Sequence, residues 1–182
     1  MKFNNIFISM MFLFLLTACA VTPMQNEVLS SNDKEVHFSY LEELSEAELK
    51  QYQQFTYNNN AEHLKGLSPE KIVLIYMHLI VTNNIELIYW LTASSQLQLD
   101  IDQFQQDYDQ YLHQLNTDMA IRLRYYNDLA TKSDLKKKHS AQVEMSVTIE
   151  SYTYTVLHEL KSEEDVWKMD LIPVMEYLKN EK

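Results

Sequence analysis

Cysteine and glycine are almost absent from this sequence of 182 residues, which contains one of each. A single cysteine excludes an internal disulfide framework and any zinc site built from several cysteines. A single glycine excludes a glycine-rich phosphate-binding loop. Together with only three prolines, it also excludes collagen-like and Pro/Gly-rich low-complexity chains. The sequence is instead 46% hydrophobic and 12% aromatic, which indicates one globular domain.

Basic residues are also scarce relative to acidic ones. The sequence has 15 lysines and arginines against 26 aspartates and glutamates, for a net charge of −11. Nucleic-acid binding and electrostatic membrane binding both depend on clustered positive charge. We therefore expect no nucleic-acid partner and no membrane attachment through the charge of the protein surface.

The N-terminus has the features of an export signal. Lys2 precedes an apolar run, Ile6 to Leu16, that is typical of a secretory signal and shorter than the roughly 20 residues needed to span a bilayer. The run ends in Leu16-Thr17-Ala18-Cys19, which resembles the lipobox of bacterial lipoproteins. The resemblance implies that residues 1–18 are a signal peptide and that the thiol of Cys19 receives a diacylglyceryl group, with acyl chains such as palmitate. The alternatives are an ordinary signal peptide that happens to contain cysteine, or an uncleaved anchor.

Cleavage before Cys19 would have clear physical consequences. It would leave 164 residues with a net charge of −12, because Lys2 is lost. Buried acyl chain contributes about 0.8 kcal/mol per CH₂, so two chains anchor a protein stably. Residues 19–37 are polar and aperiodic, as expected of a flexible tether. We therefore expect a protein of the cell envelope, held to the membrane by the lipid on Cys19 and facing the extracytoplasmic side.

Apolar spacings of three and four residues predict helices in the first half of the domain. Residues 38–66 are expected to form a helical N-terminal extension, which ends near Gly66 in a turn with positive φ. Ser68-Pro69-Glu70 is a strong helix start, with a capping serine, a proline at the first helical position and an acid near the positive end of the dipole. Helices are expected over residues 40–55, 69–81, 85–92 and 101–115, the last capped by Asp100.

An alternation of period two predicts strands in the second half. Strands are expected over residues 121–126, 143–149, 152–160 and 166–171, followed by a short C-terminal helix after Pro173. The turn near Glu150 is poorly signalled, so residues 143–160 could instead form one bent strand. Helices followed by antiparallel strands indicate an α+β fold. We expect the stripe Ile72, Ile75, Tyr76 and Leu79 to pack against Val143, Met145, Val147 and Trp167.

Three short motifs resemble a known superfamily. They are Ser68-Pro69-Glu70 opening a helix, Tyr89-Trp90-Leu91 in a short helix, and a last strand reading Val166-Trp167-Lys168-Met169-Asp170. Together they resemble the nuclear transport factor 2-like superfamily, also described as the cystatin-like cone. The resemblance implies that residues 67–182 form helices packed on a curved antiparallel sheet, with a conical cavity between them.

The preceding residues 38–66 resemble an extension found in small bacterial lipoproteins of this type. The superfamily includes enzymes, binding modules and inactive scaffolds. Because one fold can carry all of these, the resemblance implies an architecture and does not identify a function.

Few residues have the spacing of catalytic or metal-binding groups. No two of the six histidines have the spacing of a helical metal pair, and no HExxH motif occurs, so we expect no metal or cofactor. His78 lies beside the apolar stripe, where it is either a general base facing the cone or a histidine at the edge of the core. The acids after Asp100 do not form an EF-hand, because Phe104 stands at the fifth position. Asp107 and Asp109 are expected on a solvated face.

Basic and aromatic residues give the remaining candidates. Arg122 and Arg124 would share one strand face with Tyr126, and would hold an anion if that face lines the cone. On a solvent face they would be surface charges paired with Glu144. Lys136 to Lys138 would contact anionic headgroups or form a solvated loop. Trp90 and Trp167 are expected as core anchors. The candidate pocket residues are Tyr76, His78, Tyr89, Arg124 and Tyr126.

These observations favour an exported, lipid-anchored, non-catalytic binding or interaction module at the cell surface. Its partner would be a small ligand or an envelope protein. No G-x-S-x-G motif is present, and the lone thiol would be consumed by the lipid. The alternative is a small enzyme that uses the conical pocket with a histidine or aspartate as its base.

Overall fold

The computed structural model describes residues 38–94, 100–132 and 139–181, which belong to one compact unit. The expected signal peptide, Cys19, the tether over residues 19–37 and Lys136 to Lys138 all lie outside the described residues. Among the helices of the described part, none is long and apolar enough to cross a membrane.

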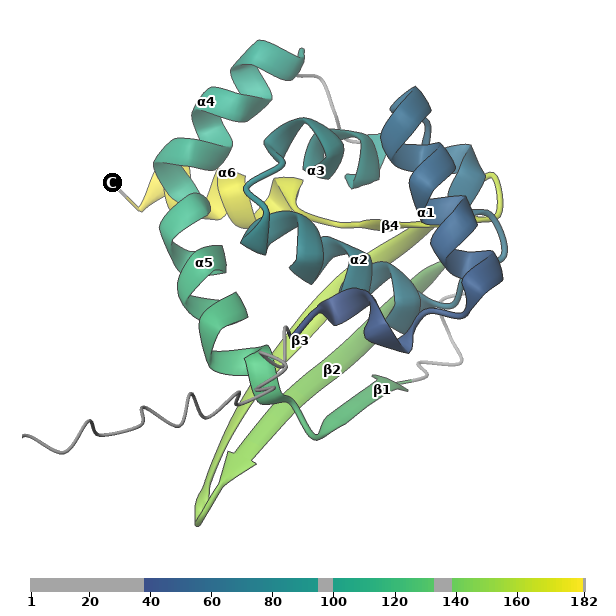
Figure 1. The fold of residues 1–182 in the computed structure, drawn as a ribbon. Coiled ribbons are helices and arrows are strands. Elements are labelled where there is room, and N and C mark those ends of the chain that lie inside the picture. The colour runs from purple at the N-terminus through teal and green to yellow at the C-terminus, as the bar shows by residue number, and fades with distance from the viewer. Residues whose placement is uncertain (1–37, 95–99, 133–138, 182) are drawn as a thin grey trace, which may run out of the picture. The chain divides into compact units, whose positions relative to one another are not determined.

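The described chain has an α+β fold, as expected from the order of the predicted elements. Helices pack against one face of a four-stranded antiparallel sheet with strand order β1-β2-β3-β4, and the sheet is not closed into a barrel (Figure 1). The α-helices are α1 (Glu46–Asn58), α2 (Pro69–Val81), α3 (Ile85–Leu91), α4 (Ile101–Tyr111), α5 (His113–Arg122) and α6 (Ile172–Asn180). The 3-10 helices are η1 (Tyr40–Glu43), η2 (Ala61–Leu64) and η4 (Leu123–Tyr125). The strands are β1 (Asp128–Lys132), β2 (Ser140–Ile149), β3 (Tyr152–Glu163) and β4 (Val166–Met169).

The longest part of the sheet is the hairpin formed by β2 and β3. Ile149 pairs with Tyr152 across a turn in which Glu150 has a φ of 55°, so residues 143–160 form two strands and not one bent strand. Side chains on alternate positions of β2 are buried beneath the helices, and those between them face the opposite side of the sheet. The alternation that predicted a half-buried strand is therefore confirmed.

Helix α2 lies at the centre of the core, and its expected packing is confirmed. Its neighbours include α3, α5, β1, β2 and β4. Trp167 is partly buried against the same cluster and is not a fully buried anchor. The buried residues of the expected interface are Ile72, Ile75, Tyr76, Leu79, Val143, Met145 and Val147.

The expected strand over residues 121–126 is wrong. Arg122 ends α5, and residues 123–125 form the 3-10 helix η4, so the first strand starts only at Asp128. Met119, Ala120 and Leu123 are buried at a helical spacing, whereas Ile121 is 67% exposed. The helical period therefore continues through this segment, and the alternation of apolar and basic residues is coincidental.

Two expected helices are each divided in the structure. The first is split into η1 and α1, because Ser45 forms a capping box with Glu48 and starts a new helix. The expected helix over residues 101–115 is divided at Leu112 into α4 and α5. Its start is as expected, since the Asp100 carboxylate accepts a hydrogen bond of 2.8 Å from the backbone N–H of Gln103.

Other predicted boundaries are confirmed. Ser68 is the N-cap residue of α2, although its side chain makes no capping hydrogen bond, and Pro69 is the first helical residue. Gly66 has a φ of 86°, a conformation that other residues adopt only with strain. Helix α1 ends later than expected, at Asn58, and its C-cap residue Asn59 lies in the left-handed region with a φ of 52°.

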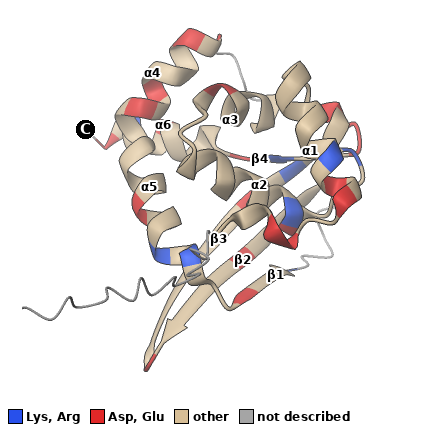
Figure 2. Cartoon of the chain, viewed as in Figure 1, with Lys and Arg blue, Asp and Glu red and all other residues tan. Residues whose placement is uncertain are grey.

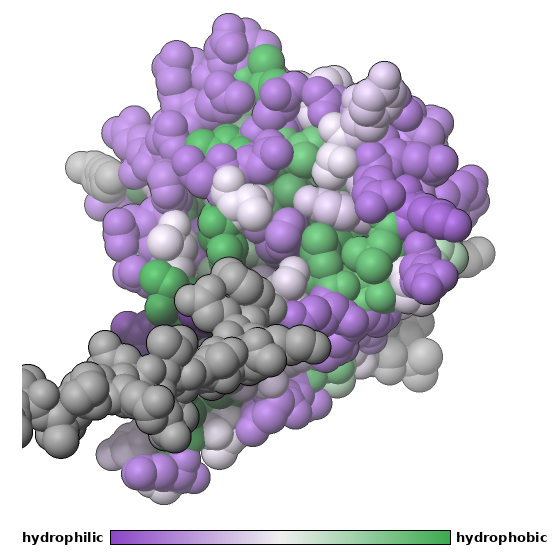
Figure 3. Space-filling view, in the orientation of Figure 1, coloured by the Kyte–Doolittle hydropathy of each residue, from purple (hydrophilic) through white to green (hydrophobic). Residues whose placement is uncertain are grey.

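Asp107 is not on a solvated face, contrary to the expectation for this acidic stretch. Its side chain is buried between α4 and α6, where it accepts hydrogen bonds from Lys179 and, at 3.0 Å, from Gln103. Lys179 lies 72 residues away in the sequence, so no local pattern revealed the pair. Asp109, two positions later, is exposed as expected. The face of the molecule in Figure 3 is mainly hydrophilic, with apolar areas in separate patches.

Candidate functional site

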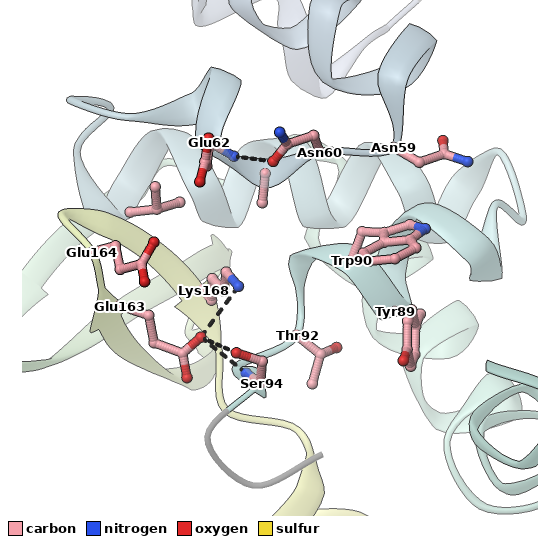
Figure 4. A pocket seen from close by; sticks show the side chains of 12 residues that line it. Asn59, Asn60, Glu62, Tyr89, Trp90, Thr92, Ser94, Glu163, Glu164 and Lys168 are labelled. Atoms are coloured by element: carbon pink, nitrogen blue, oxygen red, sulfur yellow. Dashed lines mark hydrogen bonds and ion pairs between the residues drawn. The ribbon is translucent and has the colours of Figure 1, made fainter. Parts of the chain in front are cut away.

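An open cleft with a volume of about 770 Å³ is bordered by η2, α3 and the turn between β3 and β4 (Figure 4). Segments widely separated in the sequence form it. The short stretch after α3 runs beside β4, where Thr92 forms a parallel bridge with Met169 and Ala93 donates a backbone hydrogen bond of 2.9 Å to Met169. This pairing brings the end of α3 and the following Ser94 next to the β3–β4 turn.

One wall of the cleft is aromatic and belongs to α3. This helix buries Leu87, Ile88 and Leu91, and leaves Trp90, at the edge of that buried face, 41% exposed. The Trp90 ring meets the Tyr89 ring edge-on at 5.2 Å between centroids. Trp90 is therefore a wall of the cleft and not the core anchor that the sequence predicted. An exposed indole held in one orientation is a ready surface for an apolar or cationic group.

A hydrogen-bonded carboxylate holds the base of the cleft together. Oε2 of Glu163 accepts hydrogen bonds from the backbone N–H and the hydroxyl of Ser94, at 3.0 and 2.7 Å. The same oxygen is 3.2 Å from Nζ of Lys168, and Figure 4 draws all three contacts. Because Glu163 neutralises Lys168 and ties β3 to the segment after α3, these residues give the base a fixed shape.

Two further carboxylates line the cleft and are less constrained. Glu62 in η2 and Glu164 in the β3–β4 turn are exposed, and the described residues provide no hydrogen-bond or ion-pair partner for either carboxylate. The turn itself is tight, since Glu164 and Asp165 have φ values of 52° and 66°. Asp165 pairs with Lys65 at 3.1 Å, which links the turn to the end of η2. The cleft thus has two available negative charges on the side away from Trp90.

Asn59 and Asn60 border the cleft above η2, and both already have structural roles. The side-chain amide of Asn59 donates a hydrogen bond of 2.7 Å to Glu86 on α3. The side-chain oxygen of Asn60 accepts one of 2.9 Å from the backbone N–H of Glu62. The Asn59 bond joins the end of α1 to α3, and the Asn60 bond caps the start of η2, so neighbouring residues help to fix the two helices that border the cleft.

The structure does not bring the five candidate pocket residues together. Only Tyr89 lines the cleft. Tyr76 is buried in the core, and burial raises the pKa of its hydroxyl well above the ordinary value. His78 is half-buried at the edge of the core, where its ring meets Tyr52 edge-on at 5.7 Å and burial lowers its pKa. The described contacts therefore place His78 at the core edge, the second of the two roles considered for it.

Arg124 and Tyr126 lie near η1, away from the residues that line the cleft. The Arg124 guanidinium lies 5.6 Å from the ring centroid of Tyr125 and at the same distance from that of Phe38. The hydroxyl of Tyr126 donates a hydrogen bond of 2.6 Å to Glu43. Because residues 121–125 are helical and the first strand starts only at Asp128, Arg124 and Tyr126 do not share a strand face.

The expected pairing of these arginines with Glu144 is also wrong. Glu144 pairs with Lys132 on the neighbouring strand, at 3.1 Å. The guanidinium of Arg122 lies over the Tyr154 ring instead, 5.6 Å from its centroid. Basic residues thus cluster at the C-terminal end of α5 and in the turn after it (Figure 2).

One buried histidine was not singled out from the sequence. His158 on β3 is 5% exposed, pairs in register with Val143, and lies edge-on to Tyr76 with centroids 6.1 Å apart. Burial lowers its pKa to about 4. The sequence did contain a signal for its burial, because His158 alternates with Val156 and Leu160 and therefore lies on the same face of the strand. His158 is buried and is not among the described residues that line the cleft.

The cleft itself was missed because its residues come from distant parts of the chain. The one local signal was the position of Trp90, which is four residues after Glu86 and therefore on the solvent-facing side of a short amphipathic helix. Across residues 38–94, 100–132 and 139–181, no group of three or more histidine, cysteine, aspartate or glutamate side chains could hold a metal ion. Comparison with protein-family models, curated proteins and solved structures gave no match.

Proposed function

We propose that this protein is an exported, lipid-anchored binding module of nuclear transport factor 2-like architecture, whose cleft binds a small organic cation without catalysis. One observation carries the ligand class: the half-exposed ring of Trp90 shares a cleft with the carboxylates of Glu62 and Glu164, for which the described residues offer no partner. An aromatic face and paired carboxylates are the groups that recognise an ammonium ion.

The charge of the cleft supports a cation over an anion. Lys168 is the basic residue among those described as lining it, and Glu163 already neutralises this lysine at 3.2 Å. An incoming anion would therefore meet two uncompensated carboxylates. The net charge of −11 also raises the local concentration of cations around the protein.

The size of the cleft supports a small ligand. Its volume of about 770 Å³ is within the range of roughly 300–1,000 Å³ that is usual for small-molecule sites. The distribution of its groups favours an elongated amine, with an alkyl part against Trp90 and an ammonium group near Glu62 and Glu164. No histidine is among the described residues that line it, which supports a binding role for this site.

The cellular location of the protein is proposed from its sequence. The solitary Cys19 follows Leu16-Thr17-Ala18 at the end of an apolar run, where a lipoprotein requires its cysteine. A lipid on Cys19 and a tether of residues 19–37 would present the cleft to solutes outside the cytoplasm. A module of this kind captures its ligand close to the membrane.

The test is calorimetric titration of the mature chain, with Cys19→Ser to keep it soluble. The probe is spermidine, a linear triamine, and the uncharged control ligand is an octanediol of similar length. We expect saturable binding of spermidine and none of the diol. Trp90→Ala and the double variant Glu62→Gln/Glu164→Gln should each weaken binding by roughly tenfold or more, since one charge-assisted contact contributes about 1.5–3 kcal/mol.

A matched control separates the cleft from general charge effects. The double variant Glu176→Gln/Glu181→Gln removes the same two charges from exposed positions on and after α6, and it should bind spermidine nearly as the parent does. Equal weakening by both double variants would indicate binding to the overall negative charge. That result, or no binding of spermidine at all, would reject the proposed ligand class.

A further inference from the structure

The far end of the β2–β3 hairpin carries apolar side chains that no helix of the described part covers. The hairpin projects beyond the helices (Figure 1). Ile149 and Tyr152 pair in register at its end and are 66% and 80% exposed. By the alternation of the strand they are on the same face as the buried Val147. The helix-covered face of the sheet therefore continues past the helices into solvent.

The end of α5 contributes to the same region. Arg122 reaches the hairpin, since its guanidinium lies 5.6 Å from the ring centroid of Tyr154 on β3. The adjacent Ile121 is exposed, as is Tyr125 in η4. We use the name hairpin end for the four exposed residues Ile121, Tyr125, Ile149 and Tyr152.

The described part of the chain begins beside this region. Phe38, the first described residue, lies 5.9 Å from Tyr125 between ring centroids, and Arg124 lies over both rings at 5.6 Å. Eighteen residues separate Phe38 from Cys19. If these residues form the flexible tether expected from the sequence, their root-mean-square span is roughly 25 Å. A lipid on Cys19 would therefore hold Phe38 and the adjoining hairpin end within reach of the bilayer.

We propose that the hairpin end lies against the lipid surface in which Cys19 is anchored, an inference that rests on the lipid anchor of the proposed function. Tyrosines and aliphatic side chains are suited to the bilayer interface, where the ring is buried and the hydroxyl stays wet. Arg122 and Arg124 lie beside this region and can bind lipid phosphates. Because the anchor makes the contact intramolecular, weak intrinsic affinity is sufficient.

Net charge alone would not drive this contact. Glu150 in the hairpin turn and Asp128 at the start of β1 are acidic groups at the same end, and they offset the two arginines. The contact therefore depends on apolar burial and on the anchor. This agrees with the expectation that the charge of the surface does not hold the protein to the membrane.

The orientation would leave the cleft accessible. Strand β3 runs from Tyr152 at the hairpin end to Glu163 at the cleft. At about 3.3 Å per residue this strand is about 35 Å long. With the hairpin end on the bilayer, the cleft would be held away from the lipid and open to solutes.

The test uses the single cysteine of the chain. The mature protein is coupled through Cys19 to a maleimide lipid in vesicles of phosphatidylglycerol and phosphatidylcholine, and compared with the thiol-capped protein in solution. Hydroxyl-radical footprinting read by mass spectrometry measures side-chain exposure. Oxidation of Tyr125, Ile149 and Tyr152 should fall by about threefold or more on anchoring as lipid covers them. Tyr57 and Tyr177, which are exposed on α1 and α6, should be unchanged.

Each other outcome would overturn the proposal. Unchanged oxidation at the hairpin end would mean that it does not contact lipid. Equal protection in the capped, dilute protein would mean that residues 20–37 cover it, and protection that rises with protein concentration would indicate a second copy. Spermidine binding is measured on the same anchored sample. If the hairpin end is not protected but spermidine still binds, the membrane contact is rejected and the proposed ligand class stands.

Discussion

The carboxylate of Glu70, in the first turn of α2, accepts hydrogen bonds from both the backbone N–H and the hydroxyl of Thr131 on the edge strand β1. The backbone bond measures 3.0 Å. Sixty-one residues separate the two in the sequence, and the contact fixes the start of the central helix against the edge of the sheet. Burial raises the pKa of Glu70, but the hydrogen bonds from Thr131 and Ser68 lower it more, so the net pKa is below its ordinary value.

Glu70→Gln should therefore destabilise the protein in a pH-dependent way. A depressed carboxyl pKa contributes stability above the ordinary value of 4.5, and this contribution is lost as the pH falls through the lower pKa of the folded state. After allowing for partial solvent screening, we expect a loss of about 1 kcal/mol in the free energy of unfolding at pH 7. Urea denaturation at pH 7 and pH 3 checks this. An equal loss at both values would contradict the charged contact.

His158 should make the fold sensitive to mild acid. Its pKa is lowered from 6.5 to about 4 by burial, and its Nε2 atom has no hydrogen-bond partner. The histidine binds a proton more readily in the unfolded state than in the folded state. The free energy of unfolding is therefore highest above about pH 6.5 and falls as the pH drops towards 4. The loss over this range should be about 3 kcal/mol.

The variant His158→Leu tests that prediction. It removes the titrating group and the unpaired nitrogen from the core, so it should flatten the stability profile between pH 7 and pH 4. The neighbouring exposed Leu157 supplies the control, since Leu157→Ala removes no ionisable group and should leave the shape of the profile nearly unchanged. A profile that stays equally steep in His158→Leu would show that other groups cause the acid sensitivity.

The buried pair of Asp107 and Lys179 should be a larger contributor to stability than any exposed acid of α4. Asp107→Asn would leave Lys179 without its partner in a partly buried position. We expect a loss of about 2 kcal/mol, below the usual 3–5 kcal/mol because Lys179 keeps some contact with water. Asp109→Asn, on the same helix but exposed, should cost less than about 0.5 kcal/mol. Thermal or urea unfolding of both variants checks the difference, and similar losses would contradict it.

Lipidation of Cys19 remains a prediction from the sequence. Protein taken from the membrane fraction of a bacterial host should begin at Cys19 and carry the mass of a diacylglyceryl group. Cys19→Ala should release or misprocess the protein. Mature protein with an unmodified Cys19 thiol would contradict the anchor and remove the basis for the proposed membrane contact.

Local signals in the sequence were sufficient for much of the fold. Pro69 after a serine, and Asp100 before an apolar run, each marked a helix start that the structure confirms. The alternation at Val143, Met145 and Val147 marked a strand with one buried face. These features are encoded within a few residues, because caps and periodicity act over one or two turns.

Other features depended on contacts that no local pattern contains. Residues 121–126 alternated like a strand, but Leu123 is buried against the core in the 3-10 helix η4, which follows α5 directly. Asp107 could be recognised as buried only through its partner on a helix at the other end of the chain. The cleft joins Glu62, Trp90 and Glu164 from three separate segments, so the sequence predicted a pocket of different composition.

The central claim is that Trp90 lies at the site where a cation binds. The chain has two tryptophans, and Trp167 is outside the described lining of the cleft. Trp167→Phe therefore leaves Trp90 as the sole indole, and Trp90→Phe leaves only Trp167. Titration with spermidine at constant ionic strength, followed by tryptophan fluorescence, should give a saturable change in Trp167→Phe and none in Trp90→Phe. A saturable change in Trp90→Phe, or none in either variant, would contradict the proposed cation site.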